Sequence, residues 1–300
     1  MKLIKIAYSN MWWDKCPADY LLECYACLRG HYRFEFSDNP QLAIYSVYNN
    51  ISNRYPNAVR VVISGESGDD FGLGGKGICE PGFFHFGITG AREQHSPNHR
   101  YMPIGFLHLN LWQDGVATLL RPTHYLPPWP KEFFCNFIYS NGGPARRLEI
   151  FQKLSRYKRV EACGAVARNN NDISELLNTE KERYQQKRSF QSRCKFSLAI
   201  ENTIFPGYNT EKITDPFVAG SVPIYFGDPR IAESFNPKAF LNWGDYDSDE
   251  EAIEYIEAVD KDDALYSSYL NAPPFPNNRI PTEFSDAAYL EFWKTILDPI

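Results

Sequence analysis

Polar side chains gather between residues 201 and 212, directly after a predicted strand. The ends of strands are the places where parallel α/β sheets commonly bind anions. Glu201 and Asn202 follow directly on residues 195–200, whose apolar side chains predict a buried strand. Lys212 lies in the first turn of a predicted helix, where the helix dipole disfavours a cation unless an anion is near. These residue types, at a strand end and a helix N-terminus, predict an anion site at the edge of a sheet.

The neighbouring residues define the helix that carries Lys212. Asn209 or Thr210 can cap its N-terminus, and Gly220 can end it. Residues 222–226 are apolar and predict the next strand. The segment is therefore expected to form a strand, a loop, a helix and a second strand, the repeating unit of parallel sheets.

Apolar runs typical of buried strands recur along the chain, with helical patterns between many of them. Strands are predicted at residues 3–8, 33–36, 42–48, 58–63, 84–89, 135–139, 159–163, 196–200 and 222–226. Further helices are predicted at 18–28, 147–156 and 173–191, after Ser248, whose capping box is completed by Glu251, and at 286–297. This alternation predicts the α/β class with parallel sheets.

Proline and glycine mark a boundary near the middle of the chain. Residues 122–130 contain four prolines, and a second turn-rich stretch follows at 139–144. We place the domain boundary at residue 142, which gives an N-terminal domain of residues 1–142 and a C-terminal domain of residues 143–300. The last helix, 286–297, is able to pack back on the first domain.

Composition excludes several classes of partner. The formal net charge of −6 gives no general electrostatic attraction to nucleic acid or to an anionic membrane, although a few local cations suffice for a small anion. No apolar run is long enough to span a membrane, and the N-terminal run is too short for a signal peptide.

The cysteines favour a reducing compartment. The seven cysteines are odd in number and scattered along the chain. Cys24 and Cys27 form a CxxC pair that no second pair completes into a zinc site, and we expect both to lie in the helix at 18–28. Reduced, mostly packed thiols are therefore expected, and with them a cytoplasmic location.

Three motifs in order, with tight spacing, resemble the donor-binding signature of the α-1,3/4-fucosyltransferase family, glycosyltransferase family 10. They are ENT at 201–203, YNTEK at 208–212 and AGSVPIYFG at 219–227. The resemblance is strongest over residues 195–245 and thin over the first 140 residues. It implies the GT-B architecture, in which two Rossmann-like domains face each other across a cleft. The chain has no N-terminal anchor of the kind that Golgi members carry, which favours a bacterial-type, cytosolic member.

The resemblance implies GDP-fucose as donor and gives four residues a role in binding it. Lys212 and Arg168 would bind the diphosphate, Asn202 the fucose hydroxyls and Glu211 the ribose. Arginine suits phosphate because its planar fork donates two parallel hydrogen bonds. The structural alternatives are a solvated helix lysine, a surface arginine, a turn-forming asparagine and a favourable acid in the first turn of a helix.

Three further residues of the motifs have less specific roles. Glu201 is either a second carboxylate that faces the sugar or a buried, hydrogen-bonded structural acid. Tyr208 either contacts the nucleotide or is simply half-buried. Thr210 belongs to the same motif and is counted with the donor-binding residues as well as being a candidate helix cap.

The general base is expected in the first domain. Residues 58–63 form an apolar strand that ends in Ser64, Gly65 and Glu66, and family members carry a similar Gly-Glu pair with the glutamate as proposed base. The glycine would permit a sharp turn that aims the carboxylate into the cleft. Asp69 and Asp70 are rivals for this role, and a solvated loop glutamate is the structural alternative.

Other candidate motifs are weaker. Trp12 and Trp13 could stack on acceptor sugars, but packing in the core or in a lid is equally compatible. Residues 72–77 fit GxGxxG but start no helix, and Pro97 lies between His95 and His99, which have the spacing of helical zinc ligands. Because no Asp-x-Asp motif flanked by apolar residues occurs, we expect no metal ion and no cofactor beyond the donor substrate.

The favoured function is an inverting fucosyltransferase. It would transfer L-fucose from GDP-fucose to a hydroxyl, with O3 of N-acetylglucosamine in a galactose-containing glycan of the Lewis type as the expected acceptor. One alternative is a GT-B glycosyltransferase that uses another nucleotide sugar. Another is a catalytically silent glycan-binding protein, which Lys212 and Arg168 disfavour because such a protein needs no diphosphate ligands.

Overall fold

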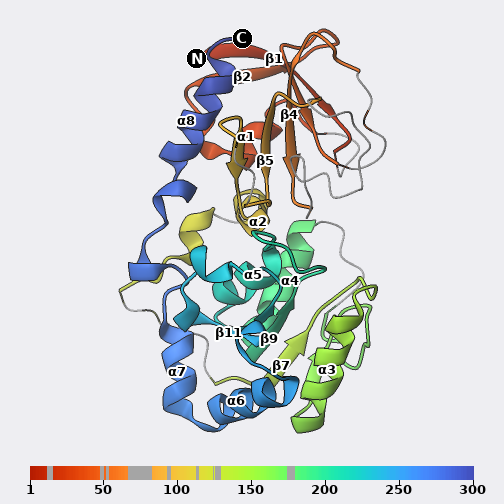
Figure 1. Cartoon of the computed structure of the whole chain (residues 1–300), viewed down its shortest axis with the longest axis vertical. Helices are drawn as coiled ribbons and strands as arrows, with labels where there is room; N and C mark the ends of the chain where they lie inside the picture. The colour runs from red at the N-terminus through yellow and green to blue at the C-terminus, as the bar shows by residue number, and fades with distance from the viewer. Residues whose placement is uncertain are drawn as a thin grey trace. The chain divides into compact units, whose positions relative to one another are not determined.

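The computed structural model describes residues 1–11, 16–47, 51, 54–66, 83–92, 96–112, 115–123, 125, 130–173 and 180–300. They divide into two compact units (Figure 1). The first unit comprises Met1–Leu111, Phe205–Tyr208 and Ile280–Ile300, and the second comprises Trp112–Ile204 and Asn209–Arg279. Along the chain the division thus comes between Leu111 and Trp112, whereas the sequence suggested a boundary at residue 142.

The first unit is built on a six-stranded sheet with the order β2-β1-β3-β4-β5-β6. Every neighbouring pair is parallel. Its strands are β1 (Lys2–Ser9), β2 (Tyr32–Phe36), β3 (Leu42–Tyr45), β4 (Val59–Ser64), β5 (Phe86–Thr89) and β6 (His99–Tyr101). The last of these was not predicted, because it is only three residues long and half-buried.

The prediction of a single helix over residues 18–28 is wrong. The structure has a short α1 (Tyr20–Cys24) and a 3-10 helix (Ala26–Leu28) instead. Tyr25 separates them with a non-helical backbone, at φ −133° and ψ 82°. Its side chain is buried against Trp293. Core packing of this ring therefore outweighs the helical tendency of the local sequence, and Cys24 and Cys27 lie in different elements.

Two further helices complete the first unit. Helix α2 (Ile104–Trp112), whose last residue groups with the second unit, was not predicted from the sequence. The C-terminal helix α8 (Asp286–Leu297) was predicted, and it packs on the core of the first unit through Trp293, Ile296 and Leu297. The end of the chain therefore contributes to the same core as its beginning.

The second unit is built on a five-stranded sheet with the order β11-β10-β9-β7-β8, again with parallel neighbours. Its strands are β7 (Phe133–Phe137), β8 (Val160–Ala162), β9 (Cys194–Ile200), β10 (Val222–Phe226) and β11 (Leu241–Asn242). Its helices are α3 (Ala145–Tyr157), α4 (Glu180–Ser192), α5 (Glu211–Ala219), α6 (Asp249–Lys261) and α7 (Asp263–Asn271). The predicted α/β class with two parallel sheets is confirmed.

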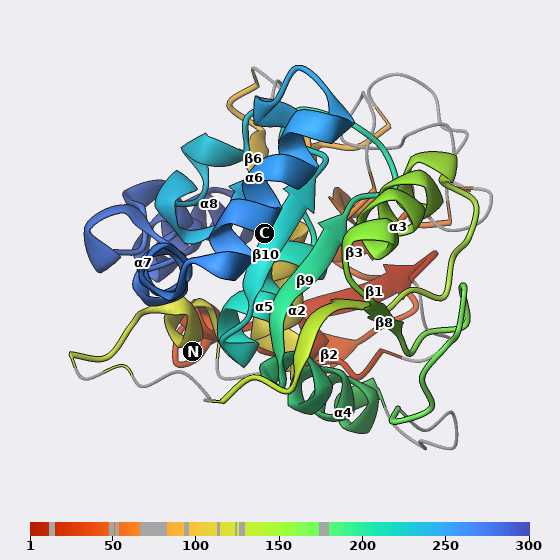
Figure 2. The ribbon, with the colours of Figure 1, turned by 90° about the horizontal axis from the view of Figure 1, so that it is seen from below.

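Strand β9 lies at the centre of this sheet and is covered on both faces (Figure 2). Phe196, Leu198 and Ile200 share one core with the buried residues of α3 and α6. The alternating residues Ser197 and Ala199 are also fully buried, as expected for a strand with helices on either side. Helices α4 and α5, which contact each other, both contact β9 as well.

The start and end of α5 agree with the sequence. The Thr210 hydroxyl caps the helix by accepting a hydrogen bond from the backbone N–H of Lys212. Gly220 ends it with a left-handed backbone at φ 70°, which a residue with a side chain rarely adopts. These two residues place Lys212 in the first turn of α5, next to the carboxyl end of β9.

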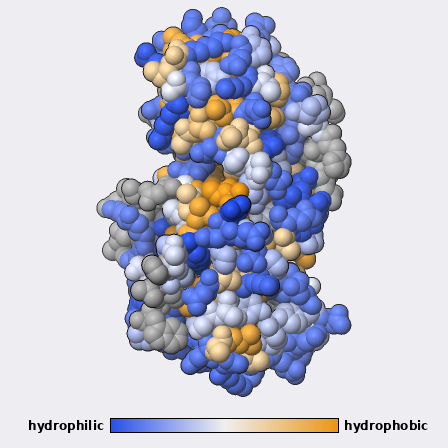
Figure 3. Space-filling model, turned by 90° about the vertical axis from the view of Figure 1, so that its left-hand side faces the viewer, coloured by the Kyte–Doolittle hydropathy of each residue, from blue (hydrophilic) through white to orange (hydrophobic). Residues whose placement is uncertain are grey.

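The face shown in Figure 3 is largely hydrophilic, with hydrophobic residues gathered in small patches. Within the described ranges, no helix has the length and apolar character needed to cross a membrane. The cysteines of these ranges, Cys16, Cys24, Cys27, Cys135, Cys163 and Cys194, all carry free thiols, and all but Cys27 are buried.

We predict that Trp293→Ala destabilises the protein. Trp293 is 0% exposed, and its ring centroid lies 5.3 Å from that of Tyr25. Removing so large a buried ring loses its burial and leaves a cavity, so the free energy of unfolding of the first unit should fall by about 3–5 kcal/mol. Denaturant unfolding measures this change, followed by far-ultraviolet circular dichroism because tryptophan fluorescence would itself be altered by the substitution.

Glu291→Ala is the matched control, because Glu291 is exposed on the same helix. Its effect should stay within about 0.5 kcal/mol. If Trp293→Ala had as small an effect as this control, α8 would not be part of the stabilising core.

Candidate functional site

A pocket of about 580 Å³ lies within the second unit. It is lined by residues that follow β7, β8 and β9 and by side chains of α3, α4 and α5: Ile138, Tyr139, Ser140, Asn141, Arg147, Cys163, Gly164, Ala165, Arg168, Ile173, Arg183, Tyr184, Lys187, Asn202, Glu211 and Lys212. Five of these residues are basic and one is acidic. This volume is typical of small-molecule sites, and the charge of its lining favours an anion.

Parallel strands explain why these residues meet. The carboxyl ends of β7, β8 and β9 lie at one edge of the sheet, because all three strands run in the same direction. Ligand sites of open α/β sheets form at this edge. Helix α5 adds its N-terminus there, with the positive end of its dipole and Lys212 in the first turn.

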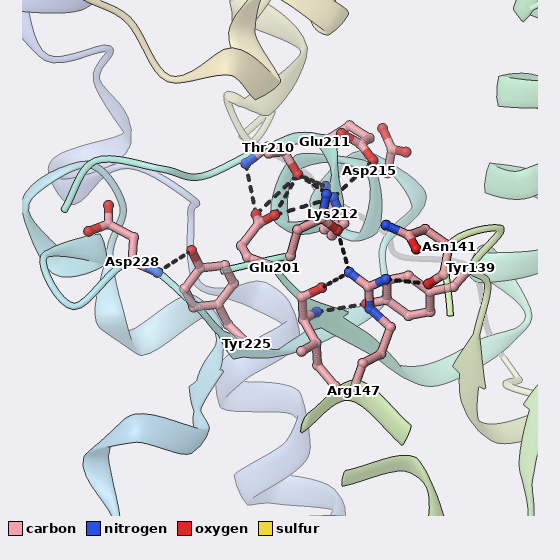
Figure 4. A network of polar contacts seen from close by, with 12 residues as sticks. Tyr139, Asn141, Arg147, Glu201, Thr210, Glu211, Lys212, Asp215, Tyr225 and Asp228 are labelled. Carbon is pink, nitrogen blue, oxygen red and sulfur yellow. Dashed lines mark hydrogen bonds and ion pairs between the residues drawn. The ribbon is translucent and has the colours of Figure 1, made fainter. Parts of the chain in front are cut away.

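Glu201 supports this helix start from within the protein. Its side chain is fully buried and accepts hydrogen bonds from the Thr210 backbone N–H at 2.8 Å and from the Thr210 hydroxyl at 2.9 Å (Figure 4). Lys212 Nζ lies 3.3 Å from Glu201 Oε2 and donates to the Thr210 hydroxyl at 3.0 Å. Burial raises the pKa of Glu201, while the nearby Lys212 acts to lower it.

Lys212 lies close to a second carboxylate as well. Glu211 Oε1 lies 3.5 Å from the same Nζ, and the Lys212 side chain is 13% exposed. Glu211 and Lys212 both line the pocket, whereas Glu201 lies behind them. Of the two roles open to Glu201 from the sequence, the structure places it as the buried, hydrogen-bonded acid.

The last glycine of the 219–227 motif is required by Glu201. A Cβ atom at Gly227 would lie 2.5 Å from Glu201 Cγ and 2.9 Å from the Tyr225 hydroxyl oxygen. Atoms this close overlap, so only glycine leaves room for the buried carboxylate. This explains the position of Gly227 in the motif without any contact to a ligand.

Arg147 is a site residue that our sequence reasoning missed. It is 1% exposed, and its guanidinium lies 4.1 Å above the ring of Tyr139. It donates hydrogen bonds to the carbonyl oxygens of Asn141 at 2.7 Å and Ile200 at 3.1 Å, and to Asn202 Oδ1 at 2.6 Å (Figure 4). Arg147 therefore joins the ends of β7 and β9 on the wall of the pocket.

A signal for Arg147 was present in the sequence. The buried residues of α3 are Arg147, Ile150, Phe151 and Leu154, which follow the spacing of one helix face. An arginine on an otherwise apolar face must have buried hydrogen-bond partners, because an unpaired charge there would be costly. The pattern of residues 147–156 by itself predicts only a helix, because two partners of Arg147, Ile200 and Asn202, lie far along the chain.

Helix α4 contributes two more basic residues that the sequence did not single out. Arg183 and Lys187 are one helical turn apart and both line the pocket. Lys187 Nζ lies 2.8 Å from Asp215 Oδ2, and Asp215 is buried on α5. Like Lys212, Lys187 thus has a buried carboxylate behind it.

Arg168 lies in the loop after β8, where the sequence predicted it. It is exposed and lines the pocket, and its guanidinium donates to the carbonyl oxygens of Cys163 at 2.9 Å and Gly164 at 3.2 Å. The loop passes close to β7, because a Cβ atom at Gly164 would lie 2.3 Å from the carbonyl oxygen of Tyr139. This close approach requires glycine and brings Arg168 to the pocket.

The structure thus brings together four of the seven predicted donor-binding residues: Arg168, Asn202, Glu211 and Lys212 line one pocket. Glu201 and Thr210 are buried behind Lys212. Tyr208 is 4% exposed and groups with the first unit, and it is not among the lining residues of the pocket.

The predicted base, Glu66, lies in the first unit, directly after β4. It is half-buried, and its backbone N–H donates to the Ser64 hydroxyl at 3.1 Å. Gly65 is needed for a reason other than a turn: its backbone is not left-handed, but a Cβ atom there would lie 2.3 Å from Ile104 Cγ1. Glycine allows β4 and α2 to approach closely.

Several other sequence candidates lie outside the described residues. They are the rival acids Asp69 and Asp70, the aromatic pair Trp12 and Trp13, His95 and the glycine-rich segment 72–77. Their roles stay as predicted from the sequence.

Comparison with known proteins was consistent with the motifs. Residues 130–272 match the family model for the C-terminal domain of glycosyltransferase family 10, the fucosyltransferases. The chain is 27% identical over 336 aligned positions to the Helicobacter pylori alpha-(1,3)-fucosyltransferase, covering 98% of this chain and 66% of that protein. It is 31% identical over 173 positions to human 4-galactosyl-N-acetylglucosaminide 3-alpha-L-fucosyltransferase 9, covering 57% of this chain and 42% of that enzyme.

The fold is also similar to solved structures. A crystal structure of an alpha1,3-fucosyltransferase superposes with a TM-score of 0.74 at 25% identity, over 99% of this chain and 90% of the other. A crystal structure of an alpha1,3-fucosyltransferase with GDP gives the same TM-score at 24% identity. This similarity confirms the GT-B class. The chain spans less than two thirds of the length of the curated relatives named above.

The residues that line the pocket, from Ile138 to Lys212, all lie inside the matched segment. The same segment contains the three motifs at 201–227. Residues 130–272 of this chain therefore form a domain of glycosyltransferase family 10, the fucosyltransferases.

Proposed function

We propose that the protein is an inverting α-1,3-fucosyltransferase that uses GDP-fucose. The observation that carries this proposal is the basic pocket of the second unit, in which Arg168, Asn202, Glu211 and Lys212 come together. All four lie in the segment that matches the model of glycosyltransferase family 10, and three of them belong to the motifs. Crystal structures of alpha1,3-fucosyltransferases with this fold contain GDP or GDP-fucose.

The basic residues would serve the leaving group. As the bond between fucose C1 and the phosphate oxygen breaks, negative charge grows on the diphosphate. Lys212 and Arg168 would stabilise that charge most in the transition state, which is what accelerates the reaction. Arg147, Arg183 and Lys187, which line the same pocket, raise the positive potential there.

The other half of the reaction would use the first unit. The acceptor hydroxyl oxygen attacks C1 from the side opposite the diphosphate, so the β-linked donor gives an α-fucoside. A base must take the proton of that hydroxyl, and we assign this role to Glu66. Asp69 and Asp70 remain the alternatives, with Glu201 disfavoured because it is buried behind Lys212.

The proposed acceptor is O3 of N-acetylglucosamine in a galactose-containing glycan. The name of the human relative supports this choice, since it specifies a 4-galactosyl-N-acetylglucosaminide and position 3. We keep Trp12 and Trp13 as candidates for stacking on the acceptor sugars.

We also propose that the reaction needs no metal ion, because lysine and arginine supply the positive charge that a cation would otherwise bring to a diphosphate. A cytoplasmic location is part of the same proposal. It is supported by the free thiols at the cysteine positions of the described ranges.

We predict that GDP raises the thermal midpoint of this protein and that UDP and CMP do not raise it comparably. A ligand that binds only the native state stabilises it by mass action, by about 2.7 kcal/mol at a hundred times its dissociation constant. Differential scanning fluorimetry with the three nucleotides at equal concentration measures this. Equal shifts with all three would indicate a general phosphate site and would contradict a preference for GDP.

We predict that fucosyl transfer persists in EDTA and depends on Lys212. In the same metal-free buffer, Lys212→Ala should lower turnover by roughly a hundredfold or more, because the charge of the departing diphosphate loses its nearest lysine. Initial rates with GDP-fucose and an N-acetyllactosamine acceptor measure both effects.

Lys238→Ala is the matched control, since Lys238 is an exposed lysine that does not line the pocket. It should leave the rate unchanged. A reaction that EDTA abolishes and manganese restores would overturn the metal-free mechanism.

We predict that Glu66→Gln lowers turnover by roughly a hundredfold or more and leaves GDP affinity near that of the wild type. The amide keeps the shape of the side chain but cannot take up the proton. Glu66 lies in the first unit and is not among the residues that line the basic pocket. The acid limb of the pH–rate profile should also disappear in the variant.

The control is Glu35→Gln, an exposed glutamate on β2 of the same unit. If Glu66→Gln kept most of its turnover, the role of base would pass to Asp69 or Asp70. If it unfolded the protein instead, Glu66 would be a structural residue.

A further inference from the structure

Arg147 has a property that the proposed reaction does not yet use. It is 1% exposed, whereas the preceding residue of α3, Arg146, is partly exposed and pairs with acids. Arg147 instead donates to three neutral oxygens, those of Asn141, Ile200 and Asn202. Its Nε has no hydrogen-bond partner among the described residues. A buried arginine on a pocket wall with only neutral partners needs a functional explanation.

The contact with Asn202 settles how its carboxamide is turned. An arginine can only donate hydrogen bonds, so the atom that it meets at 2.6 Å must be the carboxamide oxygen. The oxygen and nitrogen of a carboxamide are similar in shape, so it is this hydrogen bond that fixes the orientation of the Asn202 amide. Asn202 is exposed and lines the pocket, so Nδ2, with its two N–H groups, is the end available to a ligand.

The guanidinium itself is held firmly. It stacks on Tyr139 at 4.1 Å, and the Tyr139 hydroxyl in turn donates to the Leu198 carbonyl at 2.8 Å and accepts from the Ile200 N–H at 2.7 Å. Tyr139 and Arg147 thus form one buried assembly that connects the ends of β7 and β9 (Figure 4). Such support restricts Asn202 to one orientation before any ligand binds.

We infer that Arg147 is a positioning residue for donor binding. It turns Asn202 so that this residue presents N–H donors, and not its oxygen, to an acceptor oxygen of the nucleotide sugar. The charge of Arg147 also adds to the potential that attracts the diphosphate. This inference rests on the proposed function, since GDP-fucose is the ligand whose oxygens Asn202 would meet.

The first test needs no ligand. Asn202→Asp places a carboxylate oxygen against Arg147, so its thermal midpoint should equal or exceed that of the wild type, whereas Asn202→Ala loses the contact and should unfold at a lower temperature. Differential scanning calorimetry of the full chain measures both. If Asn202→Asp were less stable than Asn202→Ala, the arrangement of Arg147 and Asn202 would be wrong, whatever the substrate is.

The second test is a double-mutant cycle on the dissociation constant of GDP-fucose, measured by isothermal titration calorimetry. Arg147→Lys keeps the charge but cannot reach three oxygens, and both it and Asn202→Ala should weaken binding by about tenfold. If Arg147 acts through Asn202, the double variant should bind GDP-fucose no more weakly than Asn202→Ala alone. Arg156→Lys, an exposed position on α3, is the control and should bind as the wild type does.

The outcomes separate the two proposals. Additive effects in the double variant, or no effect of Asn202→Ala, would overturn the positioning role even if the enzyme is a fucosyltransferase. Wild-type protein that does not bind GDP-fucose would instead overturn the proposed function, and the stability comparison would still decide the arrangement. The dissociation constant of GDP, measured beside that of GDP-fucose, shows which oxygen Asn202 meets. If Asn202→Ala weakens the binding of both ligands, that oxygen belongs to a phosphate. If it weakens only the binding of GDP-fucose, the oxygen belongs to the sugar.

Discussion

The buried carboxylate of Glu201 is the contact on which the arrangement of the pocket depends. It follows β9 directly and accepts hydrogen bonds from Thr210, the cap of α5, while facing Lys212 at 3.3 Å. It therefore ties the end of the central strand to the start of the helix. Removing one partner of a buried ion pair costs about 3–5 kcal/mol, because the other charge is left without compensation. Position 227 requires glycine, because the Glu201 side chain fills the space that a Cβ atom there would need.

The pocket combines several positive charges, and the protein limits the cost of bringing them together. Lys212 and Lys187 each have a buried carboxylate behind them, Glu201 and Asp215 respectively. Like charges that converge without such partners would repel one another and destabilise the fold. The carboxylates lie on the protein side of the lysines, so the side that lines the pocket keeps a positive potential for an anion.

The chain crosses between the two units within the second motif. Tyr208 groups with the first unit, and Asn209 begins the part that groups with the second. The motif at 208–212 thus belongs partly to each unit, and its residues have different surroundings although they are close together in the sequence. Tyr208 is buried, while Glu211 and Lys212 line the pocket. The C-terminal segment 280–300 returns to the first unit as well, where α8 completes its core.

The sequence by itself determined the elements that local patterns control. The strands around 196–200 and 222–226, the cap at Thr210 and the glycine end of α5 were all predictable, because apolar alternation and capping chemistry act between near neighbours. The family resemblance also predicted Lys212, Glu211, Asn202 and Arg168 as donor-binding residues, and the structure brings these four to one pocket.

Only the tertiary structure decided features that depend on residues far apart in the chain. The break at Tyr25 arises from packing against Trp293, and Gly65 is required by Ile104, contacts that no local pattern reveals. Arg147 belongs to the site because parallel strands bring Asn141, Ile200 and Asn202 to one edge of the sheet. Local sequence specifies the conformation of each segment, whereas the partners of a buried charge are specified by which strand ends meet, and this is set by the order of strands in the sheet.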